Sequence, residues 1–196
     1  MRSGPFAAAA FAPAALSPPT PVTTRAPDHF ALFGIEPRFA VDADALERAY
    51  RRVQEQVHPD RFAAGSAAER RVAMQWATRA NEAFQTLRSP LKRAAYLCER
   101  HGAPIAAESN TAMAPEFLMQ QLELREALQA ARSDREPASL ARLREEVDRL
   151  REETIAALSE ALDSLHDYPR AAGLVRQLMF IEKFGEEVAA AEAEAA

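Results

Sequence analysis

The spacing of apolar residues constrains the fold of this 196-residue chain more than any other feature of its sequence. Between 140 and 165, apolar and small residues recur in alternating steps of three and four, at Leu140, Leu143, Val147, Leu150, Thr154, Ala157, Ala161 and Leu165. Residues at that spacing share one face of an α-helix, whereas a half-buried strand needs strict alternation. Similar spacing recurs along most of the chain, and glycine and β-branched residues are few. The sequence therefore predicts an all-α protein.

Capping residues and prolines divide residues 28–101 into four predicted helices. The first opens after Asp28. The second opens after either Asp42 or Asp44, since Asp44 could form a capping box with Glu47. Prolines and one glycine mark the other boundaries, at Pro59, Ser89-Pro90 and Gly102. Four such helices predict a compact small domain.

The same spacing predicts which faces of the third and fourth helices are buried. The third helix carries one stripe, formed by Val72, Trp76, Ala80, Phe84 and Leu87. The fourth carries another, formed by Leu91, Ala94, Leu97 and Cys98. We expect these stripes to contribute to the core of the first domain.

A second helical region follows a break in the pattern. Periodicity lapses over 102–114, which we expect to be a linker, and returns over 115–187. Three helices are expected there, with breaks marked by Pro115, Pro137 and Pro169. Short breaks between long helices place neighbours antiparallel, so this region is predicted to be an antiparallel three-helix bundle. Residues 188–196, which are mostly alanine and glutamate, are expected to fray.

Residues 1–27 are rich in alanine, proline and threonine and contain no acidic residue, so we expect a disordered extension. Its apolar segment resembles a secretion signal, but several prolines interrupt the helical middle that such a signal needs. No apolar run is long enough to cross a bilayer. We therefore expect a cytoplasmic protein with no membrane partner.

The sequence lacks the patterns of catalytic, nucleotide or metal chemistry. Cys98 is the single cysteine, which excludes an internal disulfide and fits a reducing compartment. It lies near His101, but no second Cys/His pair completes a metal site. No Gly-rich phosphate loop or nucleophile elbow is present, and the net charge of −5 disfavours nonspecific nucleic-acid binding. We expect a protein that is not an enzyme and has no cofactor, catalytic residue, metal or nucleic-acid partner.

The segment QEQVHPDRFAAG, residues 54–65, joins the second and third predicted helices. Pro59 pushes His58 out of the helical region and removes a backbone donor, so the chain leaves the helix at a fixed angle. Asp60 then presents a carboxylate beyond the helix end. A basic stripe that suits an acidic protein partner leads to this turn; it consists of Arg48, Arg51, Arg52 and Arg61. The residues alone leave two interpretations open, a plain helix stop or a contact site.

The fifth predicted helix has more apolar residues than one buried stripe needs. Phe117, Leu124 and Leu128 form the stripe, and a second apolar set lies away from it. This second set, with its neighbouring acids, is Leu118, Met119, Leu122, Glu123 and Glu126. On the seventh helix, Phe180 and Phe184 likewise point away from the main stripe. Such surpluses mean either helix packing on both sides or an exposed patch for a partner.

Three stretches of the first region resemble a J-domain, the module by which co-chaperones engage DnaK-type ATPase chaperones. They are DHFALFGI, LERAYRRVQEQVHPDRF and ATRANEAFQTLRSPLKRAAYL. The resemblance implies that His58, Pro59 and Asp60 trigger ATP hydrolysis in the partner chaperone. It also implies that the four arginines named above form the basic docking surface. The family often has lysine after the aspartate, and Arg61 keeps that charge with a different donor geometry.

Two stretches of the second region resemble the C-terminal domain of the HscB family, J-type co-chaperones of iron-sulfur cluster assembly. They are FLMQQLELREAL and VRQLMFIEKF. The resemblance implies two partners, an HscA-like DnaK-type chaperone and an IscU-like iron-sulfur scaffold. It places scaffold binding at Leu118, Met119, Leu122, Glu123, Glu126 and Phe180. Met179 stands where a relative can carry a basic residue, which puts a polar contact there in doubt.

These observations predict a co-chaperone that stimulates an HscA-like ATPase and delivers an IscU-like scaffold to it, in support of iron-sulfur protein maturation. Two alternatives stay open. A J-domain co-chaperone could serve another client, and the heptad-like sixth helix could instead belong to a coiled-coil interaction or oligomerisation protein.

Overall fold

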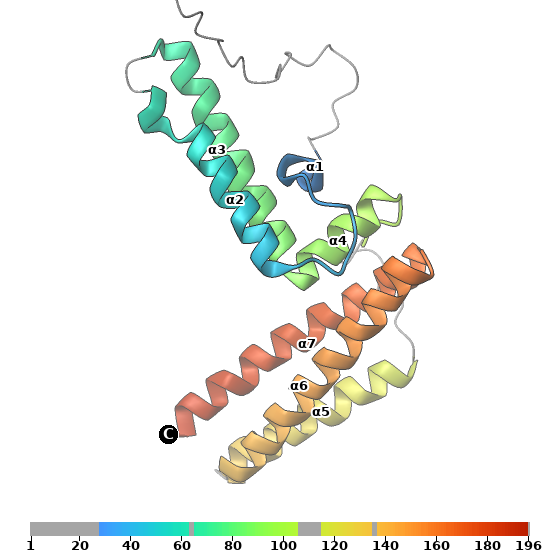
Figure 1. The fold of residues 1–196 in the computed structure, drawn as a ribbon. Coiled ribbons are helices and arrows are strands. Elements are labelled where there is room, and N and C mark those ends of the chain that lie inside the picture. Colours follow the sequence, from blue (N-terminus) through green and yellow to red (C-terminus); the bar gives the residue numbers. More distant parts are fainter. Residues whose placement is uncertain (1–27, 63–64, 106–114, 135–136, 196) are drawn as a thin grey trace, which may run out of the picture.

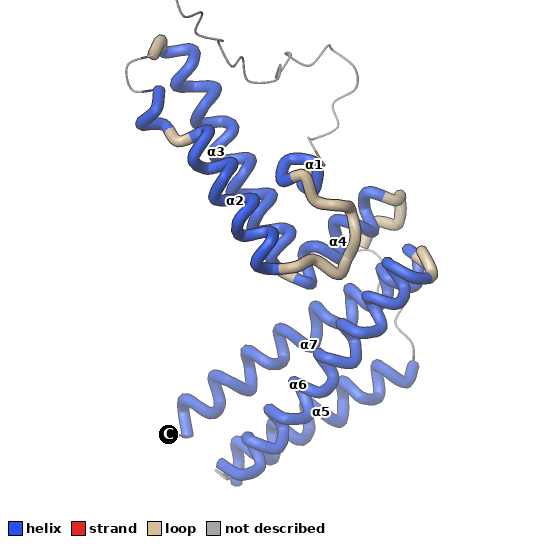
Figure 2. Tube along the Cα trace, viewed as in Figure 1, coloured by secondary structure: helices blue, strands red, loops and turns tan. Residues whose placement is uncertain are grey.

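The computed structural model describes residues 28–62, 65–105, 115–134 and 137–195. Within these ranges every regular element is helical, and the helices form two lobes (Figures 1 and 2). The prediction of an all-α protein with a four-helix domain and a three-helix bundle is confirmed. The predicted disordered extension and residues 106–114 of the predicted linker lie outside the described residues.

The N-terminal lobe contains four α-helices and one 3-10 turn. The α-helices are α1 (His29–Phe33), α2 (Ala43–Val57), α3 (Ala67–Arg88) and α4 (Pro90–Arg100). The turn, η1 (Pro59–Phe62), follows α2 at one end of the α2–α3 pair, and α4 begins at the other end of the pair (Figure 1). The turn η1 therefore lies at the end of the α2–α3 pair that is remote from α4.

Side-chain caps fix where the helices of this lobe begin. Asp42, and not Asp44, caps α2, because its carboxylate accepts hydrogen bonds from the backbone N–H groups of Asp44 at 2.9 Å and Ala45 at 3.2 Å. A capping box not predicted from the sequence starts α3. There the Glu69 N–H donates to Ser66 Oγ at 3.2 Å, and the Ser66 N–H donates to Glu69 Oε2 at 2.7 Å. Both caps satisfy backbone donors that a helix start leaves free.

The buried face of α3 differs from the prediction at its first turns. Val72 was expected on the buried stripe but is 51% exposed, and Ala73 occupies the core position instead. Ala80, Ala83 and Leu87 continue that face. Alanine lets two helix backbones approach closely, so α2 and α3 pack along small residues, and Val72 lies about 100° away from that face.

The C-terminal lobe is a three-helix bundle with an unusual turn. Its α-helices are α5 (Pro115–Asp134), α6 (Pro137–Ser159) and α7 (Tyr168–Ala195). A π-helical turn, η2 (Glu160–Ser164), extends α6 before the chain reverses. Leu165 was expected on the buried stripe of α6 but is 55% exposed, because the chain has already left the helix there.

The last helix continues beyond the predicted boundary at residue 187. Val188 and Ala191 are buried, and the Arg144 guanidinium on α6 pairs with the Glu192 carboxylate at 2.7 Å. These contacts keep α7 helical to Ala195 in place of the expected fraying. Burial of an amphipathic face stabilises a helix end more than its propensity alone.

One apolar cluster spans both lobes. It includes Phe30, Leu87 and Cys98 from the N-terminal lobe and Leu158 and Val175 from the bundle, all with no exposed surface. The contact runs chiefly between α4 and α7 (Figure 1). A second cluster fills the remainder of the bundle, between α5, α6 and α7. The two lobes are therefore joined by a continuous core.

The start of α1 is tied to the end of α4 through Asp28. Its carboxylate caps α1 by accepting a hydrogen bond from the Phe30 N–H at 3.0 Å, and it pairs with the Arg100 guanidinium. Partial burial raises the pKa of the Asp28 carboxyl. The hydrogen bonds from Arg100 and Phe30, with the charge of Arg100, outweigh this effect and hold that pKa below its ordinary value of 3.8.

We expect Asp28→Asn to lower the free energy of unfolding by about 1–2 kcal/mol at pH 7. Because the folded pKa of Asp28 lies below its unfolded pKa, the ionised carboxylate stabilises the fold above about pH 4. That contribution disappears as the pH falls through the folded pKa. Urea unfolding of both proteins from pH 2 to pH 7 measures the difference.

Asp44→Asn is the matched control, because Asp44 is exposed and does not cap α2. We expect this control to change the unfolding free energy by less than about 0.5 kcal/mol. A gap between wild type and Asp28→Asn that stays constant with pH would contradict the proposed ionic contribution.

Candidate partner-binding sites

The turn after α2 has a defined backbone geometry. His58 ends the helix in an extended conformation, with φ −60° and ψ 128°. Its carbonyl accepts a hydrogen bond from the Arg61 N–H at 3.0 Å, which closes η1. The segment from His58 to Asp60 is thus held as a turn at the tip of the lobe, and α2 ends just before Pro59, as the sequence predicted.

The side chains of His58 and Asp60 point into solvent, 55% and 90% exposed. The His58 ring nitrogen Nδ1 accepts a hydrogen bond from the Asp60 N–H at 3.3 Å. A neutral ring in that arrangement carries its proton on Nε2. The Asp60 Oδ2 lies 3.5 Å from the same Nδ1. The pair therefore presents one outward donor and one carboxylate to a partner.

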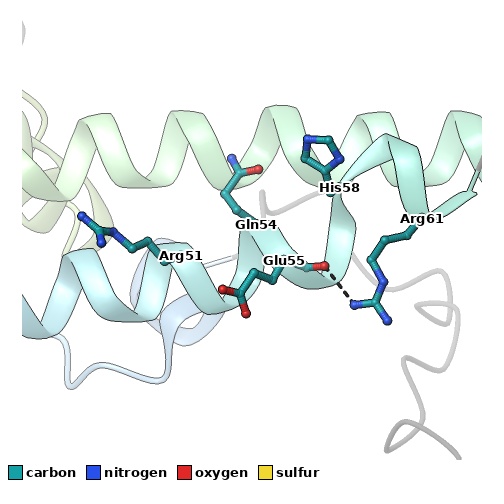
Figure 3. Close-up of a pocket in the computed structure, with 5 residues that line it drawn as sticks. All are labelled: Arg51, Gln54, Glu55, His58 and Arg61. Atoms are coloured by element: carbon teal, nitrogen blue, oxygen red, sulfur yellow. Dashed lines mark hydrogen bonds between the residues drawn. The ribbon is translucent and has the colours of Figure 1, made fainter.

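Arg51, His58 and Arg61 lie around one shallow hollow, together with Gln54 and Glu55 (Figure 3). The Arg61 guanidinium bends back and donates from Nη1 to the Glu55 carbonyl at 2.9 Å. This bond satisfies a carbonyl at the C-terminal end of α2, where cations are favoured. Arg61 thus both stabilises the helix end and lines the hollow.

Arg48 and Arg52 lie on the adjoining exposed face of α2. Arg48 is 4.0 Å from the Asp42 carboxylate, and Arg51 pairs with Glu47 at 2.5 Å. Arg52 forms no ion pair with any residue that the structure describes. The four predicted arginines are therefore all on the exposed surface of α2 and η1, with Arg52 the least engaged.

Gln54 was not singled out from the sequence, although its spacing from Arg51 and His58 is helical. Its side-chain Nε2 donates to Asn81 Oδ1 at 2.5 Å and to the Tyr50 hydroxyl at 2.9 Å. The Tyr50 ring stacks on Phe84, with the ring centroids 4.2 Å apart. These contacts join α2 to α3 beside the hollow and hold its floor in place.

The second apolar face of α5 is exposed. Leu118, Met119 and Leu122 are 48%, 58% and 50% exposed, and Glu123 and Glu126 are exposed beside them. Meanwhile Phe117, Leu124 and Leu128 are buried, as predicted for the packing stripe. Of the two interpretations left open by the sequence, the residues described here favour an exposed patch over packing on both sides.

Phe180 closes the seam between α5 and α7. Its ring meets Phe117 edge to face at 5.7 Å, stacks on Phe184 at 5.7 Å, and lies under the Arg125 guanidinium at 5.7 Å. Phe184 is buried, whereas Phe180 is only partly buried. Arg125 was missed from the sequence, because its role depends on the neighbouring helix.

Helical geometry places the exposed leucines beside this seam. The Arg125 guanidinium lies over the Phe180 ring, so the side of α5 that carries Arg125 faces α7. Leu118 and Leu122 lie about 20° and about 60° round the helix from that direction. Met179 is 41% exposed next to Phe180. Met119 lies about 120° round the helix from the direction of Arg125, on the outer side of Leu122. We call Leu118, Met119, Leu122 and Phe180 the seam patch.

The described residues contain no group of three or more His, Cys, Asp and Glu side chains arranged for a metal ion. Burial raises the pKa of the Cys98 thiol to about 11, and this thiol lies 3.8 Å from the Tyr168 carbonyl, against which it packs. None of the described helices has the length and apolarity needed to span a membrane.

The fold and the turn together define a class of protein. A four-helix domain with His-Pro-Asp between its two long helices, joined to a helical bundle, is the architecture of a J-domain co-chaperone. Comparison with known proteins gives the family within that class. Residues 113–189 match the family model described as the HSCB C-terminal oligomerisation domain.

Relatives match over nearly their full length. The chain is 55% identical to the co-chaperone protein HscB homolog of Bordetella avium, over 85% of this chain and 98% of the relative. It is 54% identical to that of Cupriavidus taiwanensis, over 84% and 93%. The chain therefore belongs to the HscB family of co-chaperones. These relatives are named as co-chaperones and not as enzymes.

Solved structures agree with this assignment. Chaperone HscB from Vibrio cholerae matches with a TM-score of 0.74 and 33% identity, over 86% of this chain and 99% of that one. The human co-chaperone protein HscB matches with a TM-score of 0.79 and 28% identity, over 88% and 83%. The resemblance noted from the sequence is confirmed.

The burial of neighbouring leucines on α5 predicts opposite responses to the same substitution. Leu124 is 7% exposed, so we expect Leu124→Ser to lower the free energy of unfolding by about 3 kcal/mol or more. Leu122 is 50% exposed, so Leu122→Ser should lower it by less than about 1 kcal/mol. Urea unfolding followed by circular dichroism compares them, and equal losses would place Leu122 in the core.

Proposed function

We propose that this protein binds an HscA-like, DnaK-type chaperone through its J-domain and stimulates ATP hydrolysis by that chaperone. We further propose that its bundle carries an IscU-like scaffold to the chaperone and so supports iron-sulfur protein maturation. The observation that carries the proposal is the outward pair of His58 and Asp60 at the tip of the α2–α3 hairpin. A cytoplasmic location fits the buried, unpaired thiol of Cys98.

The charges around the turn suit an acidic surface on the chaperone. Arg51 and Arg61 line the hollow with His58, and Arg48 and Arg52 lie on the adjoining exposed face of α2. Guanidinium groups recognise carboxylates with two parallel hydrogen bonds. Exposed charges of this kind accelerate association more than they add affinity. The Asp60 carboxylate, with no more than a weak contact to His58, is free to accept a donor from the chaperone. Binding here would favour the hydrolysis-competent state of the partner.

The seam patch supports the client half of the proposal. Its leucines and methionine are exposed as a group, whereas the other apolar stripe of α5 is buried. An exposed apolar surface with Glu126 between Leu122 and Met119, and with Glu123 at its border, suits a protein partner with apolar side chains and basic neighbours. Holding client and chaperone on one chain raises their effective concentration without chemistry by the co-chaperone itself.

Self-association through α6 is not supported by the packing. Leu140, Leu143, Val147 and Leu150 form its heptad-like stripe, and each is at most 8% exposed. Their partners are the neighbouring helices of the same bundle. That stripe is therefore not available for an intermolecular coiled coil, whereas the leucines and methionine of the seam patch are exposed.

We expect His58→Gln to abolish stimulation of the chaperone while leaving the fold intact. The ring is exposed, and glutamine replaces its Nε2 donor, which the Asp60 N–H orients through Nδ1, with a flexible amide. A hot-spot loss of about 2 kcal/mol would weaken productive docking about thirtyfold. Steady-state ATP turnover by the chaperone, with and without the co-chaperone, measures the effect. Stimulation by His58→Gln equal to wild type would refute the J-domain proposal.

We expect Leu122→Ser to reduce scaffold binding about tenfold, because it removes a leucine that the complex would bury. Stimulation of the chaperone in the absence of scaffold should not change. Leu165→Ser is the matched control, since Leu165 is equally exposed but lies in the loop before α7.

Calorimetric titration measures the affinity of both variants for the scaffold. ATP turnover with scaffold present measures how strongly each variant stimulates the chaperone. Leu122→Ser with wild-type scaffold binding would show that the client face lies elsewhere. Sedimentation velocity of Leu122→Ser tests whether the seam patch is instead a self-association surface. In that case the variant would change the oligomeric state of the protein and leave scaffold binding unchanged.

A further inference from the structure

Asp163 in η2 accepts hydrogen bonds from the backbone of the N-terminal lobe. Its Oδ1 accepts a hydrogen bond from the Phe39 N–H at 2.6 Å, and its Oδ2 accepts one from the Ala40 N–H at 2.8 Å. The Arg38 guanidinium lies 3.9 Å from Oδ2, and the Asp163 side chain is only 12% exposed. One carboxylate of the bundle thus holds the loop between α1 and α2 of the J-domain.

The same loop is held on its other side by α4. The Phe39 ring is buried and lies under the Arg93 guanidinium, 5.0 Å from its centroid. Arg93 also donates from Nη1 to the Leu87 carbonyl. Burial lowers the pKa of Arg93, and the negative charge of Asp163 raises it. Asp163 therefore also offsets a half-buried positive charge at this junction.

The turn that carries Asp163 is a π-helix, a rare element found mostly at functional positions. The Leu165 N–H donates to the Glu160 carbonyl at 3.0 Å, which is the wide i to i+5 pattern. Such a turn changes the direction of the side chains that follow it relative to a continuous α-helix. The bundle departs from regular helix at the residue that reaches the other lobe.

The remainder of the contact between the lobes is mainly apolar and built from small residues. It also includes one single hydrogen bond, from Arg176 Nη1 to the Ile105 carbonyl at 3.0 Å, and the stacked rings of His101 and Tyr168. Ala94 and Cys98 on α4 share a core with Ala171, Ala172 and Val175 on α7. Apolar contact is non-directional, so it holds the lobes together without specifying one angle between them. Paired hydrogen bonds to a carboxylate are directional and supply that specification.

We propose that Asp163 is a positioning residue that fixes the angle between the J-domain and the client-binding bundle. The consequence for the chaperone rests on the proposed function. Helix α2 has 15 residues, so it is a lever about 22 Å long. A rotation of about 10° at its base would move the His-Pro-Asp turn by about 4 Å. Even a small loosening at Asp163 would therefore misplace one binding face relative to the other.

The angle can be measured directly on the full chain by electron–electron double resonance. Spin labels are placed at Met74→Cys on α3 and Ala156→Cys on α6, both exposed positions. The native Cys98 is buried and its thiol has a pKa of about 11, so it reacts slowly at neutral pH. Variants Asp163→Asn and Asp163→Ala are compared with Asp148→Asn, an exposed aspartate on α6.

We expect a broader distance distribution for Asp163→Asn and a still broader one for Asp163→Ala, with about a tenfold rise in the population of other angles. Circular dichroism should show unchanged helicity, and Asp148→Asn should match wild type. Distributions in both Asp163 variants that coincide with wild type would overturn the proposal. Asparagine keeps one of the two oxygen acceptors of Asp163. An effect between those of wild type and Asp163→Ala would therefore come from the loss of the contact and not from a failure to fold.

Chaperone turnover then tests the consequence for function. Stimulation without scaffold and the affinity for scaffold should both stay at the wild-type level in Asp163→Asn, since Asp163 lies in neither binding face. The additional stimulation produced by scaffold should fall severalfold. A scaffold held at the wrong angle meets the substrate site of the chaperone less often in the productive orientation. Additional stimulation equal to wild type would overturn the positioning role. A wild-type protein with no such stimulation would refute the proposed function, while the distance measurement still decides the role of Asp163.

Discussion

The packing of α4 against α7 is the contact on which the rest of this structure depends. Small helical domains bury too little surface to be very stable alone. Here Leu158, Ala161 and Leu162 of the bundle complete a cluster that begins with Phe30 and Leu87 of the J-domain. Removing one lobe would expose apolar surface on the other. The two lobes therefore share stability as well as position, and their arrangement follows from the core and not only from the linker.

That shared core determines which surfaces remain for partners. Helix α4 packs against the bundle, whereas the turn after α2 lies at the opposite end of the α2–α3 pair (Figure 1). In the bundle, α7 faces the J-domain and also packs on α5 through Phe180 and Phe184. The outer face of α5 is left uncovered, with Leu122 at its centre. The two candidate sites are thus on separate surfaces, and one partner can bind without covering the other's site.

The sequence predicts local features of this molecule better than it predicts contacts between lobes. Apolar spacing and prolines were sufficient to find the helices, because both signals act within a few turns of chain. They also separated Leu124 from Leu122, since the helix repeat alone puts them on different faces. Arg125 and the Asp163 contact were not found. Asp163 meets Phe39 across 124 residues of sequence, and no local pattern encodes that pairing. Val72 was misplaced for a related reason, because the close approach of α2 favours alanine on the buried face.

A fixed angle between the lobes affects which partners can act together. A flexible linker would let a client sample many positions, and its effective concentration at the chaperone would depend mainly on linker length. With a shared core and a directional carboxylate at Asp163, the proposed function would have the client position relative to the turn at His58 set before either partner binds. The entropy cost of fixing the two lobes relative to each other is then incurred during folding and not during assembly with the partners. A chaperone whose substrate site does not coincide with that position gains no benefit from the co-chaperone. Under the proposed function, geometry would contribute to partner selection in addition to the chemistry of the two faces.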